Sequence, residues 1–152
     1  MQIRIIIIYF ASENETMKDI KDIIRDSGLK VTPQRIAVYQ AMLQLGHASA
    51  DMVVALVAET HPTLTVATVY NILDSFEQKG LLARLAGPDT KMYFDISTHQ
   101  HCHLYCNDTQ SYMDYKDPEL EQMLNKYVTN TKIKGYKTTS IDLNIRVELE
   151  EQ

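Results

Sequence analysis

Two histidines spaced two residues apart, His101 and His103, are the residues of this chain best suited to bind a metal ion. On a β-strand, side chains at positions i and i+2 point to the same face, so both imidazoles would face one ligand and Cys102 would face the other way. A surface strand that binds no metal explains such a pair equally well. The pair therefore indicates a metal site only if the fold brings further ligands to it.

Three other residues are candidates to join this pair. Asp95 lies at the junction of the two halves of the chain, Asp114 lies on the next expected strand, and His47 lies in a loop that we expect to cap a helix. Three neutral imidazoles and two carboxylates would balance the charge of a divalent cation. This donor set suits Fe(II), Mn(II) or Zn(II), whereas the absence of thiolate ligands argues against a tetrahedral structural zinc site.

The composition is that of a globular protein without a basic surface. The chain has 152 residues, of which 45% are hydrophobic and 23% are charged, and its formal net charge is −5. This length suits one ordinary domain or two small ones. If such an acidic chain binds nucleic acid, it must rely on local geometry and a few well-placed cations.

The two cysteines, Cys102 and Cys106, are poorly spaced for a disulfide on one strand. At about 3.3 Å per residue their Cα atoms would lie roughly 13 Å apart. A disulfide requires no more than about 7 Å. Free thiols fit a reducing, cytoplasmic location.

The first 16 residues read as an extension. They contain an apolar run, residues 3–10, that is too short to span a bilayer, which takes about 20 apolar residues. A signal peptide is disfavoured because polar residues follow at once and no small-residue cleavage site is evident. We expect residues 1–16 to be a mis-assigned start or a loosely attached segment, and we expect no membrane association.

Residues 17–80 have the pattern of a helical domain. We expect helices over residues 17–27, from Thr32 to about Gly46, over residues 49–60 and over residues 65–79. Thr32 is a plausible N-cap because Pro33 follows it at the first helical position. In the third helix, the apolar positions expected to face inward are Met52, Val53, Leu56 and Val57.

The fourth expected helix, residues 65–79, is the most informative. Its buried stripe would consist of Val69, Ile72, Leu73 and Phe76. At 100° per residue the opposite face carries small and hydrogen-bonding side chains together with an exposed aromatic ring, namely Ala67, Tyr70, Asn71 and Asp74. A helix that only needs to be soluble would more often present lysine and glutamate there.

Two short strands are expected within residues 81–94, around the turn sequence Gly87-Pro88-Asp89. Helices followed by a β-hairpin form a winged helix-turn-helix, in which the fourth helix would enter the major groove of DNA. An arbitrary small helical domain explains the pattern about equally well.

The second half of the chain predicts a β-β-α-β unit. Strands are expected over residues 101–106, 111–115 and 137–148, with a helix over residues 117–131. A unit of this size is too small to bury a full core alone, so we expect it to pair with a copy of itself in a homodimer. The fold class is therefore α+β, with a winged-helix domain over residues 17–94 and a metal-binding dimerisation domain over residues 95–152.

Four sequence motifs resemble those of the ferric uptake regulator family, in the family's order and spacing across about residues 17–148. They are GLKVTPQR at 28–35, HASADMV at 47–53, VATVYNIL at 66–73 and YFDISTHQHCHLYC at 93–106. The resemblance implies a metal-dependent repressor, not an enzyme, that binds double-stranded operator DNA as a homodimer. A metal at the hinge would draw the two domains into the arrangement that fits the operator.

The resemblance also implies roles for individual residues. The regulatory metal ligands would be His47, Asp95, His101, His103 and Asp114. Lys30 would reach the minor groove, and Tyr70 and Asn71 would contact DNA from the recognition helix. Aspartate at position 114 is typical of the family's peroxide-sensing branch, in which Fe(II) reacts with peroxide and a ligand imidazole is oxidised. The matching redox-sensing residues are His47 and His101.

The chain departs from the family at two further metal sites. The family usually holds a structural zinc with two Cys-x-x-Cys pairs, but Thr109 stands where the second cysteine would be, and no cysteine follows Cys106. We therefore expect no four-cysteine zinc site. A second site seen in some relatives is also incomplete, because Gln100 and Ile141 occupy positions where histidines would be expected.

Two other functions compete with peroxide sensing. The first is an iron- or manganese-responsive repressor of the same family, which would bind DNA with metal and ignore low peroxide. The second is a small non-haem metalloenzyme, since a mixed histidine and carboxylate site can support oxygen chemistry. The sequence disfavours the enzyme because no substrate-binding residues are evident.

Overall fold

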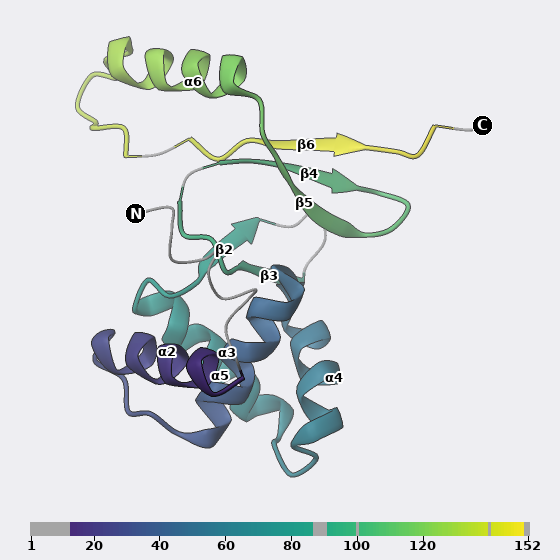
Figure 1. Ribbon diagram of the computed structural model, residues 1–152. Coiled ribbons are helices and arrows are strands. Elements are labelled where there is room, and N and C mark those ends of the chain that lie inside the picture. The colour runs from purple at the N-terminus through teal and green to yellow at the C-terminus, as the bar shows by residue number, and fades with distance from the viewer. Residues whose placement is uncertain (1–12, 87–90, 100, 140, 151–152) are drawn as a thin grey trace. The chain divides into compact units, whose positions relative to one another are not determined.

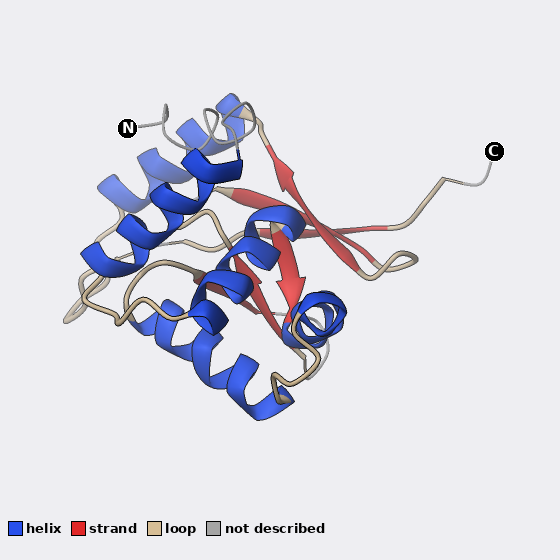
Figure 2. Cartoon of the chain, turned by 60° about the horizontal axis from the view of Figure 1, so that its bottom comes forward, coloured by secondary structure: helices blue, strands red, loops and turns tan. Residues whose placement is uncertain are grey.

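The computed structural model describes residues 13–86, 91–99, 101–139 and 141–150 of the chain. The chain divides into two compact units, with the boundary between Thr98 and His99. Helices predominate in the first unit, and the second consists mainly of strands with one helix (Figure 2). The fold is α+β, as the sequence predicts.

The first unit combines helices with a small antiparallel sheet (Figure 1). The sheet order is β1-β3-β2, and β2 and β3 form the hairpin of a winged helix. The predicted turn of this hairpin, residues 87–89, lies outside the described residues. The elements are α2 (Glu13–Asp26), α3 (Pro33–Leu45), β1 (His47–Ser49), α4 (Ala50–Thr60), α5 (Val66–Gln78), β2 (Ala83–Ala86) and β3 (Met92–Asp95).

Hydroxyl side chains determine where three of these helices begin. Each accepts a hydrogen bond from the backbone amide three residues later, which satisfies one of the amides left unpaired at a helix start. The caps are Thr32 for α3, Ser49 for α4 and Thr65 for α5. The helix starts predicted from Thr32 and Thr65 are confirmed.

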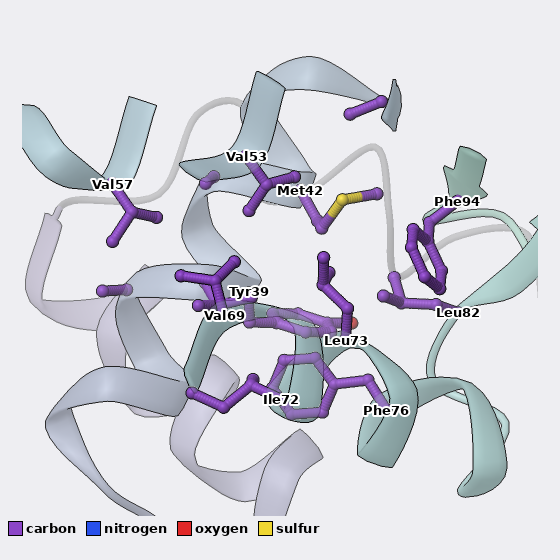
Figure 3. Packing of buried hydrophobic residues seen from close by; sticks show 14 of the residues in the cluster. Tyr39, Met42, Val53, Val57, Val69, Ile72, Leu73, Phe76, Leu82 and Phe94 are labelled. Atoms are coloured by element: carbon purple, nitrogen blue, oxygen red, sulfur yellow. The ribbon is translucent and has the colours of Figure 1, made fainter. Parts of the chain in front are cut away.

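The core of the first unit forms around the inner face of α5 (Figure 3). All four residues of the predicted stripe on α5 are buried, and Phe76 packs edge-on against Tyr39 with 5.6 Å between ring centroids. Leu82 and Phe94 are also buried in this core, which joins the sheet to the helices. The prediction that Met52 faces inward was wrong, because its side chain is 43% exposed while Val53 fills the inward position.

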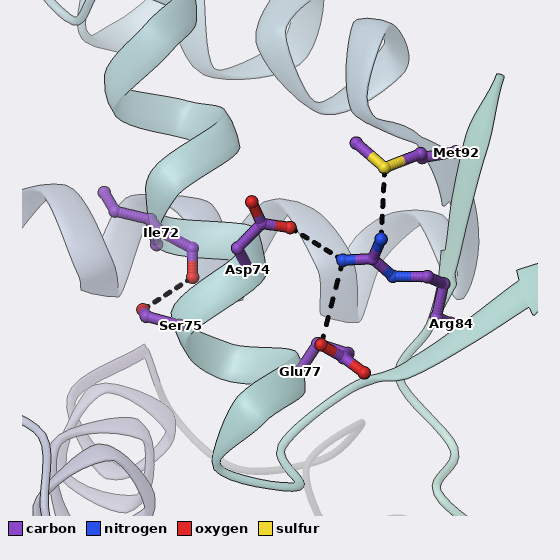
Figure 4. Close-up of polar contacts among 6 residues, drawn as sticks. All are labelled: Ile72, Asp74, Ser75, Glu77, Arg84 and Met92. Atoms are coloured by element: carbon purple, nitrogen blue, oxygen red, sulfur yellow. Dashed lines mark hydrogen bonds and ion pairs between the residues drawn. The ribbon is translucent and has the colours of Figure 1, made fainter.

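Arg84 links the hairpin to the outer face of α5 (Figure 4). Its guanidinium donates to Asp74 at 2.8 Å, lies 3.7 Å from Glu77 and stacks over the ring of Phe94. Each exposed ion pair contributes at most about 1 kcal/mol. Together these contacts orient β2 relative to the helix expected to read DNA.

The helix α2 begins earlier than expected. It starts at Glu13, four residues before the predicted start at Met17, so part of the predicted extension is helical. Residues 1–12, including the apolar run, lie outside the described residues. Within the described part of the chain, none of the helices combines the length and the apolar character needed to cross a membrane.

The second unit has the predicted β-β-α-β order. Its sheet has the order β5-β4-β6, with β4 antiparallel to β5 and parallel to β6. Its elements are β4 (Cys102–Cys106), β5 (Ser111–Tyr115), α6 (Pro118–Asn130) and β6 (Asn144–Val147). Asp117 caps α6 by accepting from the amides of Glu119 and Leu120.

The last strand is much shorter than predicted. The alternation of apolar and polar residues suggested a strand over residues 137–148, but among the described residues of this range the strand covers Asn144–Val147, which pair with residues 103–106 of β4. The length of a strand is limited by its neighbour, and β4 has only five residues. The alternation of apolar and polar residues therefore indicated a segment that is able to form a strand. The length of β4 limits how many of its residues pair.

Candidate metal centre

His47 and Asp95 form a pair across two neighbouring strands of the first unit. They are direct partners in the β1–β3 register, and His47 Nε2 lies 3.4 Å from Asp95 Oδ2. The other carboxylate oxygen of Asp95 accepts a hydrogen bond from the amide of Ser97 at 2.8 Å. That bond orients the carboxylate. We call His47 and Asp95 the β1–β3 pair.

The second unit brings three of the predicted ligands together. His103 and Asp114 are direct partners in the β4–β5 register, and His101 Nε2 lies 2.9 Å from Asp114 Oδ1. The rings of His101 and His103 lie 4.2 Å apart between centroids. This proximity confirms that the two imidazoles point to the same face. We call His101, His103 and Asp114 the β4–β5 triad.

The local setting of two ligands differs from the prediction. His47 was expected in a loop, but it begins the three-residue strand β1 that pairs with β3. A segment this short shows no periodicity, so its strand character could not be inferred from the sequence. His101 immediately precedes β4 instead of beginning it.

The chemistry of these side chains fits a divalent metal. The β1–β3 pair offers one imidazole and one carboxylate, and the β4–β5 triad offers two imidazoles and one carboxylate. In each group a histidine nitrogen already lies within 3.4 Å of a carboxylate oxygen, so ligand atoms converge. Histidine and aspartate groups of this kind indicate a metal site that takes Fe(II), Mn(II) or Zn(II).

The predicted DNA-contact residues lie on the outside of the first unit. Lys30 is exposed just before α3, and its carbonyl accepts from the Arg35 guanidinium at 2.7 Å. Asn71 is exposed and Tyr70 is half-buried on the outer face of α5. The hydrogen-bond partner of Tyr70 is Asp51 on α4, which could not be inferred from the sequence. The two residues lie too far apart in the chain for periodicity to relate them.

Neither cysteine forms a disulfide, and their environments differ. Hydrogen bonds from the side chain and backbone of Thr109 lower the pKa of the Cys106 thiol. Burial raises the pKa of the Cys102 thiol, and the nearby acids Glu121 and Asp117 add to the effect. With two cysteines in its sequence, one chain cannot supply a four-cysteine zinc site.

Hydrogen bonds hold the β4–β5 turn to the chain that follows β6. The amide of Asn107 donates to the Val147 carbonyl at 2.9 Å, and its side chain donates to Glu148 at 3.3 Å. The amide of Leu149 donates to Asp108 Oδ2 at 2.7 Å. These bonds join segments about 40 residues apart in the chain. We call them the turn clasp.

Removing the acceptor in the turn clasp should destabilise the second unit. We expect Asp108→Ala to lower the free energy of unfolding by about 1 kcal/mol, because an exposed hydrogen bond to a charged group contributes about that much. Asp108→Asn retains an oxygen acceptor and should lose less. Urea unfolding followed by circular dichroism in metal-free buffer measures both. Equal stability of Asp108→Ala and wild type would show that the clasp contributes nothing.

Known proteins share both the sequence and the fold of this chain. The model of the ferric uptake regulator family matches residues 26–146. The peroxide-responsive repressor PerR of Staphylococcus saprophyticus is 30% identical over 117 residues, which cover 75% of this chain and 79% of the relative.

The fold of this chain is also similar to that of two solved structures. The ferric uptake regulator of Vibrio cholerae matches with a TM-score of 0.70 at 25% identity, over 85% of this chain and 98% of that chain. The ferric uptake regulator of Pseudomonas aeruginosa, solved with manganese, matches with a TM-score of 0.69 at 28% identity, over 87% and 98%. The chain belongs to the ferric uptake regulator family, whose members are metal-dependent transcriptional regulators rather than enzymes, bind operator DNA and dimerise.

Proposed function

We propose that this protein is a repressor that senses peroxide through one Fe(II) or Mn(II) ion held jointly by its two units. The observation that carries the proposal is the convergence of histidine and aspartate side chains within each unit, from neighbouring strands and, for His101, from the residue just before β4. The β1–β3 pair would supply His47 and Asp95. The β4–β5 triad would supply His101, His103 and Asp114.

Neither group of ligands is sufficient alone. Two or three donors leave a first-row metal short of the four or more it normally takes. A metal that needs both groups binds best to the arrangement of the units that brings the groups together, and it increases the population of that arrangement. In a repressor, this arrangement is the one that fits operator DNA.

The first unit has the elements of a DNA-binding domain. In a winged helix-turn-helix the second helix of the motif, here α5, lies in the major groove, and a hairpin flanks the backbone. Tyr70 and Asn71 on α5 would contact DNA there, and Lys30 would reach the minor groove. In a homodimer, the metal would set the relative positions of the two winged-helix units, so DNA binding would depend on the metal.

Peroxide would end repression by altering the ligands. His47 and His101 would help to hold Fe(II), which when bound supplies the reducing power that activates peroxide. Overall, one peroxide molecule would oxidise one of these imidazoles by two electrons: one peroxide oxygen would be added to a ring carbon, and the other would leave as water. An oxidised imidazole is a poorer ligand, so the two groups of ligands would separate. The likeness to a peroxide-responsive repressor and the aspartate at position 114 support this choice.

Mass spectrometry of the peroxide-treated protein tests the proposal. We expect the Fe(II) form to release DNA as it gains one oxygen atom on His47 or His101. The Mn(II) form is the matched control, because Mn(II) does not readily reduce peroxide, and it should stay bound and unmodified. DNA release with both histidines unmodified and Cys102 or Cys106 oxidised instead would contradict the mechanism.

An iron- or manganese-responsive repressor is the second candidate. It is favoured by the likeness to ferric uptake regulators, one of them solved with manganese. Such a protein would bind DNA with either metal and retain it at low peroxide. Comparison of the Fe(II) and Mn(II) forms in one DNA titration, with and without peroxide, separates the two functions.

A further inference from the structure

An aspartate on the neighbouring helix holds the hydroxyl of Tyr70. The phenol donates a hydrogen bond to Asp51 Oδ1 at 3.1 Å. Asp51 lies in the first turn of α4, where a carboxylate also interacts favourably with the helix dipole. Burial and the hydrogen bond to Asp51 raise the pKa of Tyr70, so the phenol keeps its proton.

This contact lies where a ligand can approach it. Asp51 is exposed, and the pair borders a small cavity of about 190 Å³ on the outside of the first unit. Met92, the first residue of β3, and Lys91, which precedes it, line the same cavity. Tyr70 is therefore held at the junction of α4, α5 and the hairpin instead of pointing freely into solvent.

We propose that Asp51 determines which bases Tyr70 recognises, because it takes the only proton that the Tyr70 hydroxyl can donate. A phenol has one hydrogen to donate and lone pairs that accept, whereas a carboxylate only accepts. With its proton directed at Asp51, the Tyr70 oxygen offers DNA only lone pairs. This inference rests on the proposed function, in which Tyr70 lies at the major groove.

The consequence is a preference for bases that donate. In the major groove, cytosine N4 and adenine N6 donate, whereas guanine presents only acceptors and thymine presents an acceptor and a methyl group. Tyr70 would thus favour cytosine or adenine by about 5-fold, the effect of one hydrogen bond. The charge of Asp51 also repels phosphates, which weakens binding to all sequences equally.

Selection from a pool of randomised DNA duplexes tests this role. The full-length, Mn(II)-loaded chain is used as wild type, Asp51→Asn, Tyr70→Phe and the double variant. The amide of Asp51→Asn can donate to the Tyr70 oxygen and free the hydroxyl to donate to DNA. We expect the preference for cytosine or adenine to fall about 5-fold at one position in each half-site, while affinity for unselected DNA does not fall.

The other two variants make the test specific. Tyr70→Phe should lose the preference at the same position, and the double variant should match Tyr70→Phe. If Asp51→Asn changes the affinity for all DNA sequences equally and leaves the base preference unchanged, the inference is overturned. The inference is also overturned if Asp51→Asn changes the base preference as much in the Tyr70→Phe background as it does in the wild type. If the wild type selects no sequence, the proposed function fails and this inference fails with it. Circular dichroism verifies that each variant is folded.

Discussion

A His103→Ala variant should lose metal-dependent DNA binding and keep its fold. His103 is one of the two imidazoles of the β4–β5 triad and the direct register partner of Asp114. Loss of a residue that only orients a ligand already costs about 10- to 100-fold in metal affinity. Loss of the ligand itself should therefore weaken metal binding by at least about 100-fold, and DNA binding should no longer respond to Mn(II).

Two measurements and one control make this prediction decisive. Competition with a chromophoric chelator gives the Mn(II) affinity, and fluorescence anisotropy gives the affinity for a selected duplex with and without the metal. His99→Ala is the matched control, because its side chain is exposed and it lies only two residues before His101. If His103→Ala binds the duplex as the wild type does at every Mn(II) concentration, the metal does not gate binding through the triad.

The sequence predicted best those features that depend on near neighbours in the chain. The stripe on α5 repeats every three or four residues, and the caps Thr32 and Thr65 act within three residues. Both patterns depend on residues close together in the chain, so they can be recognised without knowledge of the fold. The strand β1 is too short to have a period, and its existence depends on pairing with β3, more than 40 residues away.

The features of the candidate site also divide into those that near neighbours in the chain predict and those that depend on the fold. The shared face of His101 and His103 follows from strand geometry, and Asp114 follows from the expectation of a hairpin. The register of β1 against β3, which sets His47 opposite Asp95, could not be derived from spacing. Nor could the hydrogen bond between Tyr70 and Asp51, because it depends on how α4 packs against α5.

Introducing charge on α6 should separate the dimer. None of the described residues of α6 is buried, and Met123 and Tyr127 are 67% and 61% exposed on one face of the helix. Large apolar side chains exposed together mark an interaction surface. In a symmetric dimer the same surface of each copy contributes, so Met123→Glu with Tyr127→Glu would bury four like charges.

The expected effect is large because four charges of the same sign would meet at one interface. If each charge costs at least about 1 kcal/mol to bury, the dimer dissociation constant should rise by about 1000-fold. Sedimentation velocity measures this, and the monomer should also lose affinity for two-half-site DNA. Asn125→Glu with Thr129→Glu is the matched control, since it adds the same charge at the same spacing on the opposite, exposed face. A Met123→Glu, Tyr127→Glu variant that dimerises like this control would place the interface on another surface.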